Sequence, residues 1–260
     1  MKPKKGQVAL FAVVGILILI LIGFTLYTRT NVFLVNPGED DLNAELDSIR
    51  THIQECIRET ADGDIGKPIV DIGFQGGYLK QGADTFRLYN DNRISYLCYN
   101  MENTEQCMNR MLLKEDMEQS IIDDVSINIG SCLDVQSFRQ FGGFDIITGG
   151  MNVMADIEKD NVKVTLDYPI TLKSKRSDAS VSARQFNAVI NYPLGDLYDV
   201  ANTIIDFETE FGDFDQFAYM LQKKGKYIIE KKKPYPDKLY ILSRRDSPYV
   251  FQFFVQGEPE

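Results

Sequence analysis

An uninterrupted apolar run near the start of the chain constrains its folding more than any other feature. From Val8 to Tyr27 the sequence VALFAVVGILILILIGFTLY contains no charged residue. At a rise of about 1.5 Å per residue, a helix of this length spans about 30 Å, the thickness of the hydrocarbon core of a bilayer. A buried core helix rarely runs so far without a charge, and the apolar part of a cleaved secretory signal is shorter, about 7–15 residues. We therefore predict a retained transmembrane or packing helix over residues 7–29.

The charges that flank this helix predict its orientation. Three lysines lie in a basic leader, residues 1–6, whereas Arg29 alone follows the apolar run closely. Because the positively charged side of a membrane helix stays in the cytoplasm, the remainder of the chain is expected outside. The triplet Asn36-Pro37-Gly38 disfavours a continuous helix, so residues 30–40 are predicted to be a hinge. The expected protein is single-pass in the cell membrane, with a cytoplasmic N-terminus and an extracellular C-terminal domain.

The exported part is strongly acidic, which excludes some partners. The whole chain has 28 Lys+Arg and 38 Asp+Glu, and its first 29 residues hold four of the basic residues and none of the acidic ones. The remainder therefore has a net charge of −14. Such a domain repels phosphate groups, so we expect neither nucleic acid nor anionic lipid heads as its partners. Membrane lipid is expected to contact the N-terminal helix only.

Four cysteines in an exported domain favour two disulfides. Cys98 and Cys107 are close enough in sequence for a local disulfide, which would leave Cys56 and Cys132 to join two helices. The composition alone allows three pairings. Zinc is disfavoured because the ligand spacing is wrong and the chain has a single histidine, His52.

Hydrophobic periodicity predicts an α+β class, in which the N-terminal transmembrane helix is followed by an extracellular domain of amphipathic helices and an antiparallel sheet. Apolar residues recur at helical spacing from Asp41 to about Gly63, from Leu113 to Ile129 and from Leu194 toward Phe211. Residues 41–150 are expected to be a disulfide-stapled helical subregion. Residues 151–260 are expected to be an antiparallel sheet plus a helix.

Strand-like alternation occurs in two groups of segments. Residues 162–168 and 186–192 each end in Tyr-Pro-apolar and predict a hairpin, with the polar sequence KSKRSDASVSA as a long exposed tip. Further strands are predicted at residues 94–99, 226–230, 239–242 and 249–255. The last of these is apolar on both faces, which is typical of a central or interface strand.

Motifs for catalysis or cofactor binding are not found, so we expect neither an enzyme nor a bound cofactor or metal. His52 is more consistent with a structural residue than with a general base. Gly76-Gly77 lacks the GxxxxGK[ST] context of a phosphate loop and predicts a tight turn between strand-like pieces. The acidic clusters at residues 39–41 and 213–215 are read as helix caps. Lysines at 223–226 and 231–233 are read as a solvated edge or as a contact for the acidic helix of a neighbouring copy.

The sequence KKGQVALF, followed by the long apolar helix, resembles the class III signal peptides of archaeal type IV pilin-like proteins. The resemblance implies processing between Gly6 and Gln7, and an apolar helix that anchors the subunit or packs in a filament core. Phe11 stands where those proteins usually carry an acidic residue. More diffusely, the chain resembles uncharacterised surface proteins of small symbiotic (DPANN-type) archaea.

Two functional hypotheses follow. The first is a homo-oligomeric structural subunit of a cell-surface filament, tube or appendage, because Ala9, Ala12, Gly15 and Gly23 permit close packing of the apolar helices. The second is a monomeric anchored adhesin or receptor for a host or cell-surface protein or glycan. The polar tip at residues 174–182 and the Gly76-Gly77 turn would then be its contact surfaces.

Overall fold

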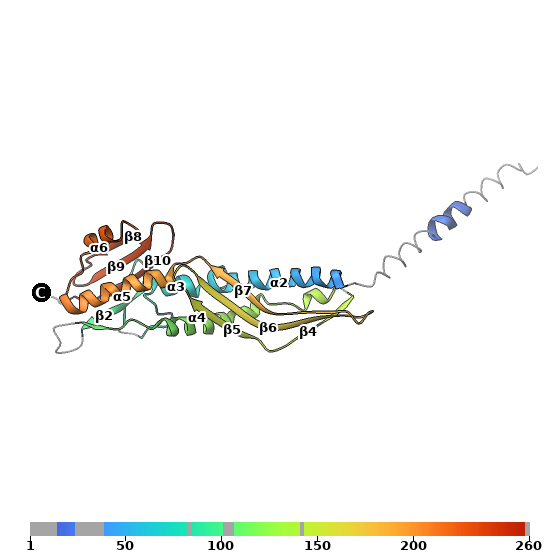
Figure 1. Ribbon diagram of the computed structural model, residues 1–260, viewed down its shortest axis with the longest axis horizontal. Helices are drawn as coiled ribbons and strands as arrows, with labels where there is room; N and C mark the ends of the chain where they lie inside the picture. The colour runs from blue at the N-terminus through green and yellow to red at the C-terminus, as the bar shows by residue number, and fades with distance from the viewer. Residues whose placement is uncertain (1–14, 24–38, 83–84, 101–106, 141–142, 258–260) are drawn as a thin grey trace, which may run out of the picture.

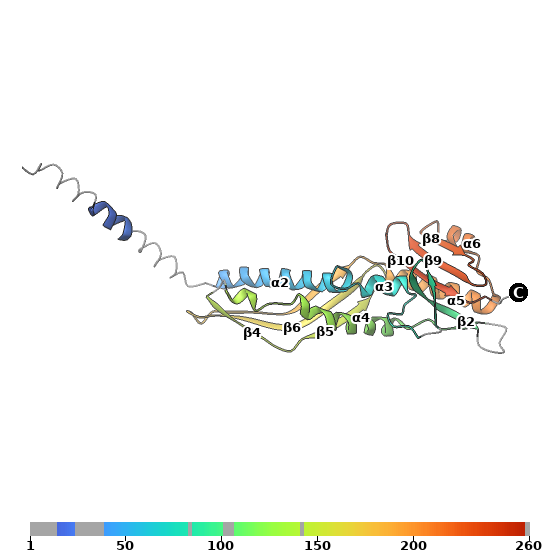
Figure 2. The ribbon, with the colours of Figure 1, turned by 180° about the vertical axis from the view of Figure 1, so that it is seen from behind.

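The computed structural model describes residues 15–23, 39–82, 85–100, 107–140 and 143–257. Residues 39–257 form an elongated α+β head, which confirms the predicted fold class (Figure 1). Both views place the start of the long helix α2 (Glu39–Asp62) at one end of the head and helix α6 (Gln216–Gln222) toward the other end (Figures 1 and 2).

Helix α2 is the longest element of the head and matches the helix predicted from residue 41. Its apolar residues recur every three or four positions, so they form one stripe along the helix. This stripe is buried against the sheet that contains residues 162–174 and 180–190. It consists of Leu42, Leu46, Ile49, Ile53 and Ile57. Exposed carboxylates at Asp40 and Asp41 lie in its first turn, where their negative charges interact favourably with the positive end of the helix dipole.

Helix α4 (Lys114–Asn128) confirms the second predicted helix and continues into a short 3₁₀ helix, η1 (Ile129–Ser131). Met117, Ile121 and Val125 are buried. The methionine therefore fills the core, as its place in the apolar stripe predicts. A second 3₁₀ helix, η2, covers Ser137–Gln140.

The first sheet is antiparallel throughout and is built around one long strand. Its strands are β4 (Phe144–Thr148), β5 (Asn152–Ile157), β6 (Val162–Ser174) and β7 (Ser180–Ile190). Strand β7 pairs with both halves of β6, while β4 and β5 each pair with one half. Strands β4 and β5 therefore share the other edge of β6, as one strand interrupted at residues 149–151.

The interruption lies opposite Tyr168-Pro169. Proline has no N–H to donate, and the β6–β7 register shifts between Asp167 and Ile170. The Gly149 amide instead donates to the Pro169 carbonyl at 2.8 Å. The prediction that this Tyr-Pro pair ends the strand is wrong, because β6 bulges here and then continues. The expected long tip of the hairpin is correspondingly reduced to residues 175–179.

The second sheet brings together segments from both halves of the chain. Its strands are β1 (Phe86–Tyr89), β2 (Asn92–Asn100), β3 (Cys107–Asn109), β8 (Tyr227–Lys232), β9 (Lys238–Arg244) and β10 (Val250–Val255). The order is β1-β2-β10-β9-β8, with β3 also paired to β2. Strand β10 is central and almost wholly buried, as its apolar pattern predicts, and it runs parallel to β2.

Helix α5 (Leu194–Phe211) packs across this second sheet and confirms the third predicted helix. Most buried apolar residues of α2, α4, α5 and both sheets form one continuous core, and a second, smaller cluster consists of Ile94, Leu239 and Phe254. The division expected near residue 150 therefore does not separate the sheets, because β4 lies in the first sheet while the β2–β10 pair crosses that boundary.

Two short helices replace segments expected to be irregular or strand-like. Helix α3 (Pro68–Phe74) precedes Gly76-Gly77, where a strand was expected. Its start at Pro68 suits proline, since the missing amide has no partner in a first turn. The turn itself is confirmed, with φ of +72° and +94° at the two glycines. Helix α6 was not predicted.

Candidate functional site

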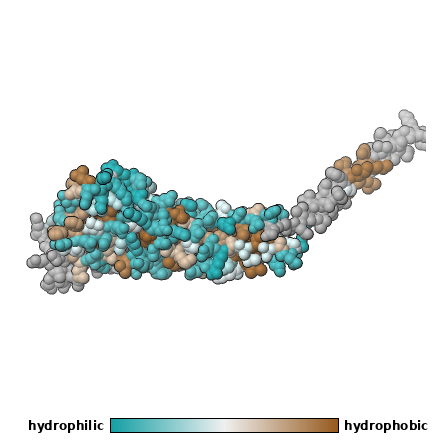
Figure 3. All heavy atoms as spheres, viewed as in Figure 1, coloured by the Kyte–Doolittle hydropathy of each residue, from teal (hydrophilic) through white to brown (hydrophobic). Residues whose placement is uncertain are grey.

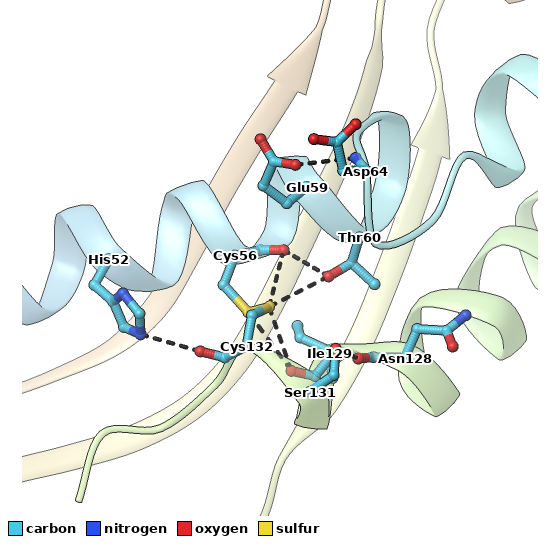
Figure 4. The surroundings of a disulfide bond; sticks show 9 residues. All are labelled: His52, Cys56, Glu59, Thr60, Asp64, Asn128, Ile129, Ser131 and Cys132. Carbon is cyan, nitrogen blue, oxygen red and sulfur yellow. Dashed lines mark hydrogen bonds between the residues drawn. A yellow bond between two sulfur atoms is a disulfide. The ribbon is translucent and has the colours of Figure 1, made fainter. Parts of the chain in front are cut away.

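The disulfide between Cys56 and Cys132 ties α2 to the end of η1, with Cα atoms 5.6 Å apart, and confirms the predicted staple. Figure 4 shows the polar groups around it. The Thr60 hydroxyl donates to the Cys56 carbonyl at 2.6 Å, and His52 Nε2 lies 3.1 Å from the Cys132 carbonyl oxygen. The His52 ring also packs 5.5 Å from that of Phe138. These contacts give His52 a structural role in joining α2 to the segment after η1.

The second disulfide joins Cys98 of β2 to Cys107 of β3, with Cα atoms 5.2 Å apart, and confirms the local pairing. In each of the two disulfides, one cysteine is buried and the other is half-buried. Disulfides persist in oxidising compartments, so both are consistent with an extracellular head.

The N-terminal apolar segment is described only at residues 15–23, which are helical. Gly6, Gln7, Ala9 and Ala12 lie outside the described residues. Gly15 and Gly23 have open space around them, and the isoleucines and leucines from Ile16 to Ile22 are 49–70 % exposed. Within the described ranges, the helices are each too short or too polar to cross a bilayer.

A cleft of about 820 Å³ opens between α3, the Gly76-Gly77 turn and α4. Four aspartates and two lysines line it, together with apolar side chains. The charged residues are Asp71, Asp116, Asp123, Asp124, Lys67 and Lys80. Because Lys67 already pairs with Asp71 at 3.6 Å, the α4 side of the cleft is its acidic side.

Tyr78 forms part of the cleft wall, and its hydroxyl donates to the Arg110 carbonyl. Burial raises the pKa of this phenol, so it stays neutral and donating at physiological pH. No cluster of three or more potential metal ligands occurs among the described residues. The cleft is thus suited to a ligand that combines apolar and cationic groups.

Ion pairs in which one partner is buried take up part of the predicted basic patch. At the start of α5, the Asp196 carboxylate lies 2.6 Å from Lys226 Nζ and 3.7 Å from Arg244 Nη1, and it accepts a hydrogen bond from the Tyr227 hydroxyl at 3.0 Å. Lys231 Nζ donates to Asp213 and to the Phe214 carbonyl. The interpretation as a solvated edge charge is therefore wrong for Lys231, whose side chain is 5 % exposed, whereas Lys223, Lys224 and Lys226 are exposed.

A second ionic cluster lies at the far end of α5. The buried Glu208 carboxylate accepts hydrogen bonds from the Tyr240 hydroxyl and from Lys238 Nζ, the latter at 2.7 Å. Burial, followed by the bond to this carboxylate, raises the pKa of the Tyr240 phenol. The two clusters tie both ends of α5 to the second sheet.

An apolar surface covers the end of the head formed by α5 and α6. Phe207 and Phe211 are 45 % and 64 % exposed, and Phe217 and Leu221 are 68 % and 80 % exposed. Figure 3 shows hydrophobic atoms at this end of the molecule. The two helices are held together by ring contacts of the buried Phe214, 5.7 Å from Phe207 and 5.4 Å from Tyr219.

Helix α6 begins at Asp215, whose carboxylate accepts hydrogen bonds from the amides of Phe217 and Ala218, both at 3.0 Å. The prediction that the acidic cluster at 213–215 caps a helix is confirmed at Asp215, whereas Asp213 instead pairs with Lys231 and Lys238. The sequence contained a usable signal, since an N-cap aspartate precedes two large apolar residues four positions apart. The acidic side of the cleft was also missed, although its aspartates recur on the polar face of α4.

Comparisons of this chain with protein-family models, with curated proteins and with solved structures found no match.

Proposed function

We propose that the chain is a membrane-anchored extracellular structural subunit that self-associates into a cell-surface filament, tube or appendage, without enzymatic activity. The observation that carries the proposal is the apolar helix at residues 15–23, in which each leucine and isoleucine side chain is at least 49 % exposed. A helix that is apolar all round is stable in lipid or against other apolar helices. Such a segment suits both anchoring and packing between copies.

The construction of the head supports the same proposal. Two disulfides and a large continuous core make it rigid, and α2 begins at one end of its long axis (Figure 1). The exposed apolar surface on α5 and α6 lies toward the opposite end. Contiguous exposed apolar side chains typically mark interaction sites. The chain thus presents separate surfaces along its length with which copies can associate.

The test uses the full-length protein purified in mild detergent and also reconstituted in lipid vesicles. We expect electron microscopy and chemical crosslinking to reveal ordered multimers that increase with protein concentration. Gly15→Ile and Gly23→Ile should weaken association, because close helix packing needs small residues, while Ile18→Leu serves as the matched control. Strictly monomeric particles at high concentration would overturn the proposal.

One observation favours a second candidate, an anchored adhesin or receptor. The Gly76-Gly77 turn adjoins the 820 Å³ cleft, which is lined by both apolar and charged residues. Clefts of this size bind small ligands or peptide side chains. Saturable binding of a glycan or cationic peptide to the full-length monomer, lost on Asp116→Lys but retained on Asp145→Lys, would favour this candidate.

A further inference from the structure

The most distinctive surface at the α6 end combines two apolar side chains with two cations. Phe217 and Leu221 are four residues apart on α6, so they project from one face of the helix, and both are more than two-thirds exposed. The exposed Lys223 and Lys224 follow directly, at a turn where Lys224 and Gly225 have φ of +54° and +70°. The result is a projecting knob with an apolar side and a cationic end, which we call the α6 knob (residues 216–224).

The α6 knob is fixed to the head rather than loosely attached. Its first turn is capped by Asp215, and on its inner side the Met220 sulfur accepts a hydrogen bond from the Ile229 amide at 3.3 Å. The Lys223 ammonium lies 5.3 Å from the centre of the Tyr219 ring. A rigid projection loses little conformational entropy when it binds, which favours recognition.

The cleft between α3 and α4 has the complementary chemistry. Leu79, Leu112 and Ile127 line it, and Ile127 is 75 % exposed. Asp116 and Asp123 lie on its α4 side and are exposed to solvent. Apolar side chains can therefore enter between them while lysines meet the carboxylates at the rim.

We infer that the α6 knob of one copy docks in the α3–α4 cleft of a second copy. This inference rests on the proposed function and specifies one of its interfaces. The head carries a large net negative charge, so two copies repel each other unless a positive surface meets a negative one. Lys223 and Lys224 provide that positive surface, and the aspartates of α4 provide the negative one. Opposite charges then set the register of the contact, while Phe217 and Leu221 supply its buried apolar centre.

The positions of the two surfaces determine what such contacts build. Helix α6, which carries the knob, lies toward one end of the head, and helices α3 and α4, which line the cleft, lie nearer its middle (Figures 1 and 2). Because the two surfaces differ, the first contact leaves a free cleft on one copy and a free knob on the other. A heterologous contact of this kind repeats into an open chain of copies, shifted along their long axes. Each knob–cleft contact is small and weak. Anchoring in one membrane raises the effective concentration of the copies, so that many such contacts form together.

Charge reversal tests this contact in the full-length protein, reconstituted in vesicles. Lys223→Glu with Lys224→Glu should lower the assembled fraction at least about tenfold, and Asp116→Lys with Asp123→Lys should do the same. The matched control, Lys163→Glu with Lys173→Glu, reverses two charges on the first sheet and should leave assembly unchanged. Mixing the two reversed proteins creates two favourable pairs, the Glu knob with the Lys cleft and the Lys knob with the Asp cleft. Mixed assemblies of alternating copies should therefore form where neither protein alone assembles.

A second readout locates the contact directly. A photoreactive side chain in place of Leu221 should crosslink to α4 of another copy, and a crosslink to α2 or β4 instead would overturn the inference. Wild-type assembly that withstands both charge reversals would overturn the α6-to-cleft contact and leave the proposed function standing. Failure of the wild-type protein to assemble at any concentration would overturn both.

Discussion

Removal of the Cys56–Cys132 disulfide should destabilise the head more than removal of Cys98–Cys107, and the difference follows from loop length. The first disulfide closes a sequence separation of 76 residues and the second one of 9. In the chain-entropy description, closing the longer loop raises the free energy of the unfolded chain by about 4.5 kcal/mol, and closing the shorter loop raises it by about 2.6 kcal/mol. The double alanine variants should therefore differ in free energy of unfolding by about 2 kcal/mol.

The comparison is well matched, because each disulfide joins one buried and one half-buried cysteine, so the cavities left by alanine are similar. Guanidinium titration of the full-length protein in detergent, followed by circular dichroism and tyrosine fluorescence, measures both variants. The 13 tyrosines supply the signal, since the chain has no tryptophan. An equal loss from both pairs, or a greater loss from Cys98→Ala with Cys107→Ala, would refute the loop-entropy reasoning.

Three further predictions concern single side chains of the head. Burial raises the pKa of the Asp62 carboxyl in the folded protein above its unfolded value of 3.8. The stability that Asp62 contributes is therefore greatest below pH 3.8 and declines as the pH rises through the folded pKa. Asp62→Asn should gain stability relative to the wild type across that pH window, as measured by a pH series of unfolding titrations. Asp196→Asn removes the buried carboxylate that contacts Lys226, Arg244 and the Tyr227 hydroxyl, and should cost about 2 kcal/mol in the same titrations. Asp199→Asn, at an exposed ion pair, should cost less than about 1 kcal/mol; equal losses would contradict this. A Cβ at Gly73 would lie 1.6 Å from a buried tyrosine hydroxyl, so Gly73→Ala should lower the melting temperature sharply, whereas Gly130→Ala, with open space, should leave it nearly unchanged.

Elements with long, regular patterns were predictable from the sequence. Helices α2, α4 and α5 each repeat apolar residues over several turns, and the alternation at residues 162–168 and 186–192 identifies β6 and β7. Both disulfides also followed from the chain, because a local pairing of Cys98 with Cys107 leaves one partner for Cys56. In these cases local pattern and tertiary structure agree.

Other features depend on contacts between distant residues, which local patterns do not report. The buried pattern of β10 indicates a central strand, yet it does not reveal that β2 is the parallel neighbour. Pro169 is a strong local signal for a strand end, but the β7 pairing on one side and the Gly149 amide on the other carry β6 past it. The α3–α4 cleft arises only when both helices dock on the core, so its aspartates read in sequence as ordinary solvent-facing residues.

The central place of β10 imposes an order on biogenesis. Strands β4 to β7 are contiguous, so that meander can assemble as soon as residues 144–190 emerge from the ribosome or translocation channel. Strands β1 to β3 emerge earlier, but the central neighbour of β2 is absent until residue 255 has been delivered. During that interval the apolar side of β2 lacks its native neighbour. The early-made part of the head thus waits longest to acquire its native structure.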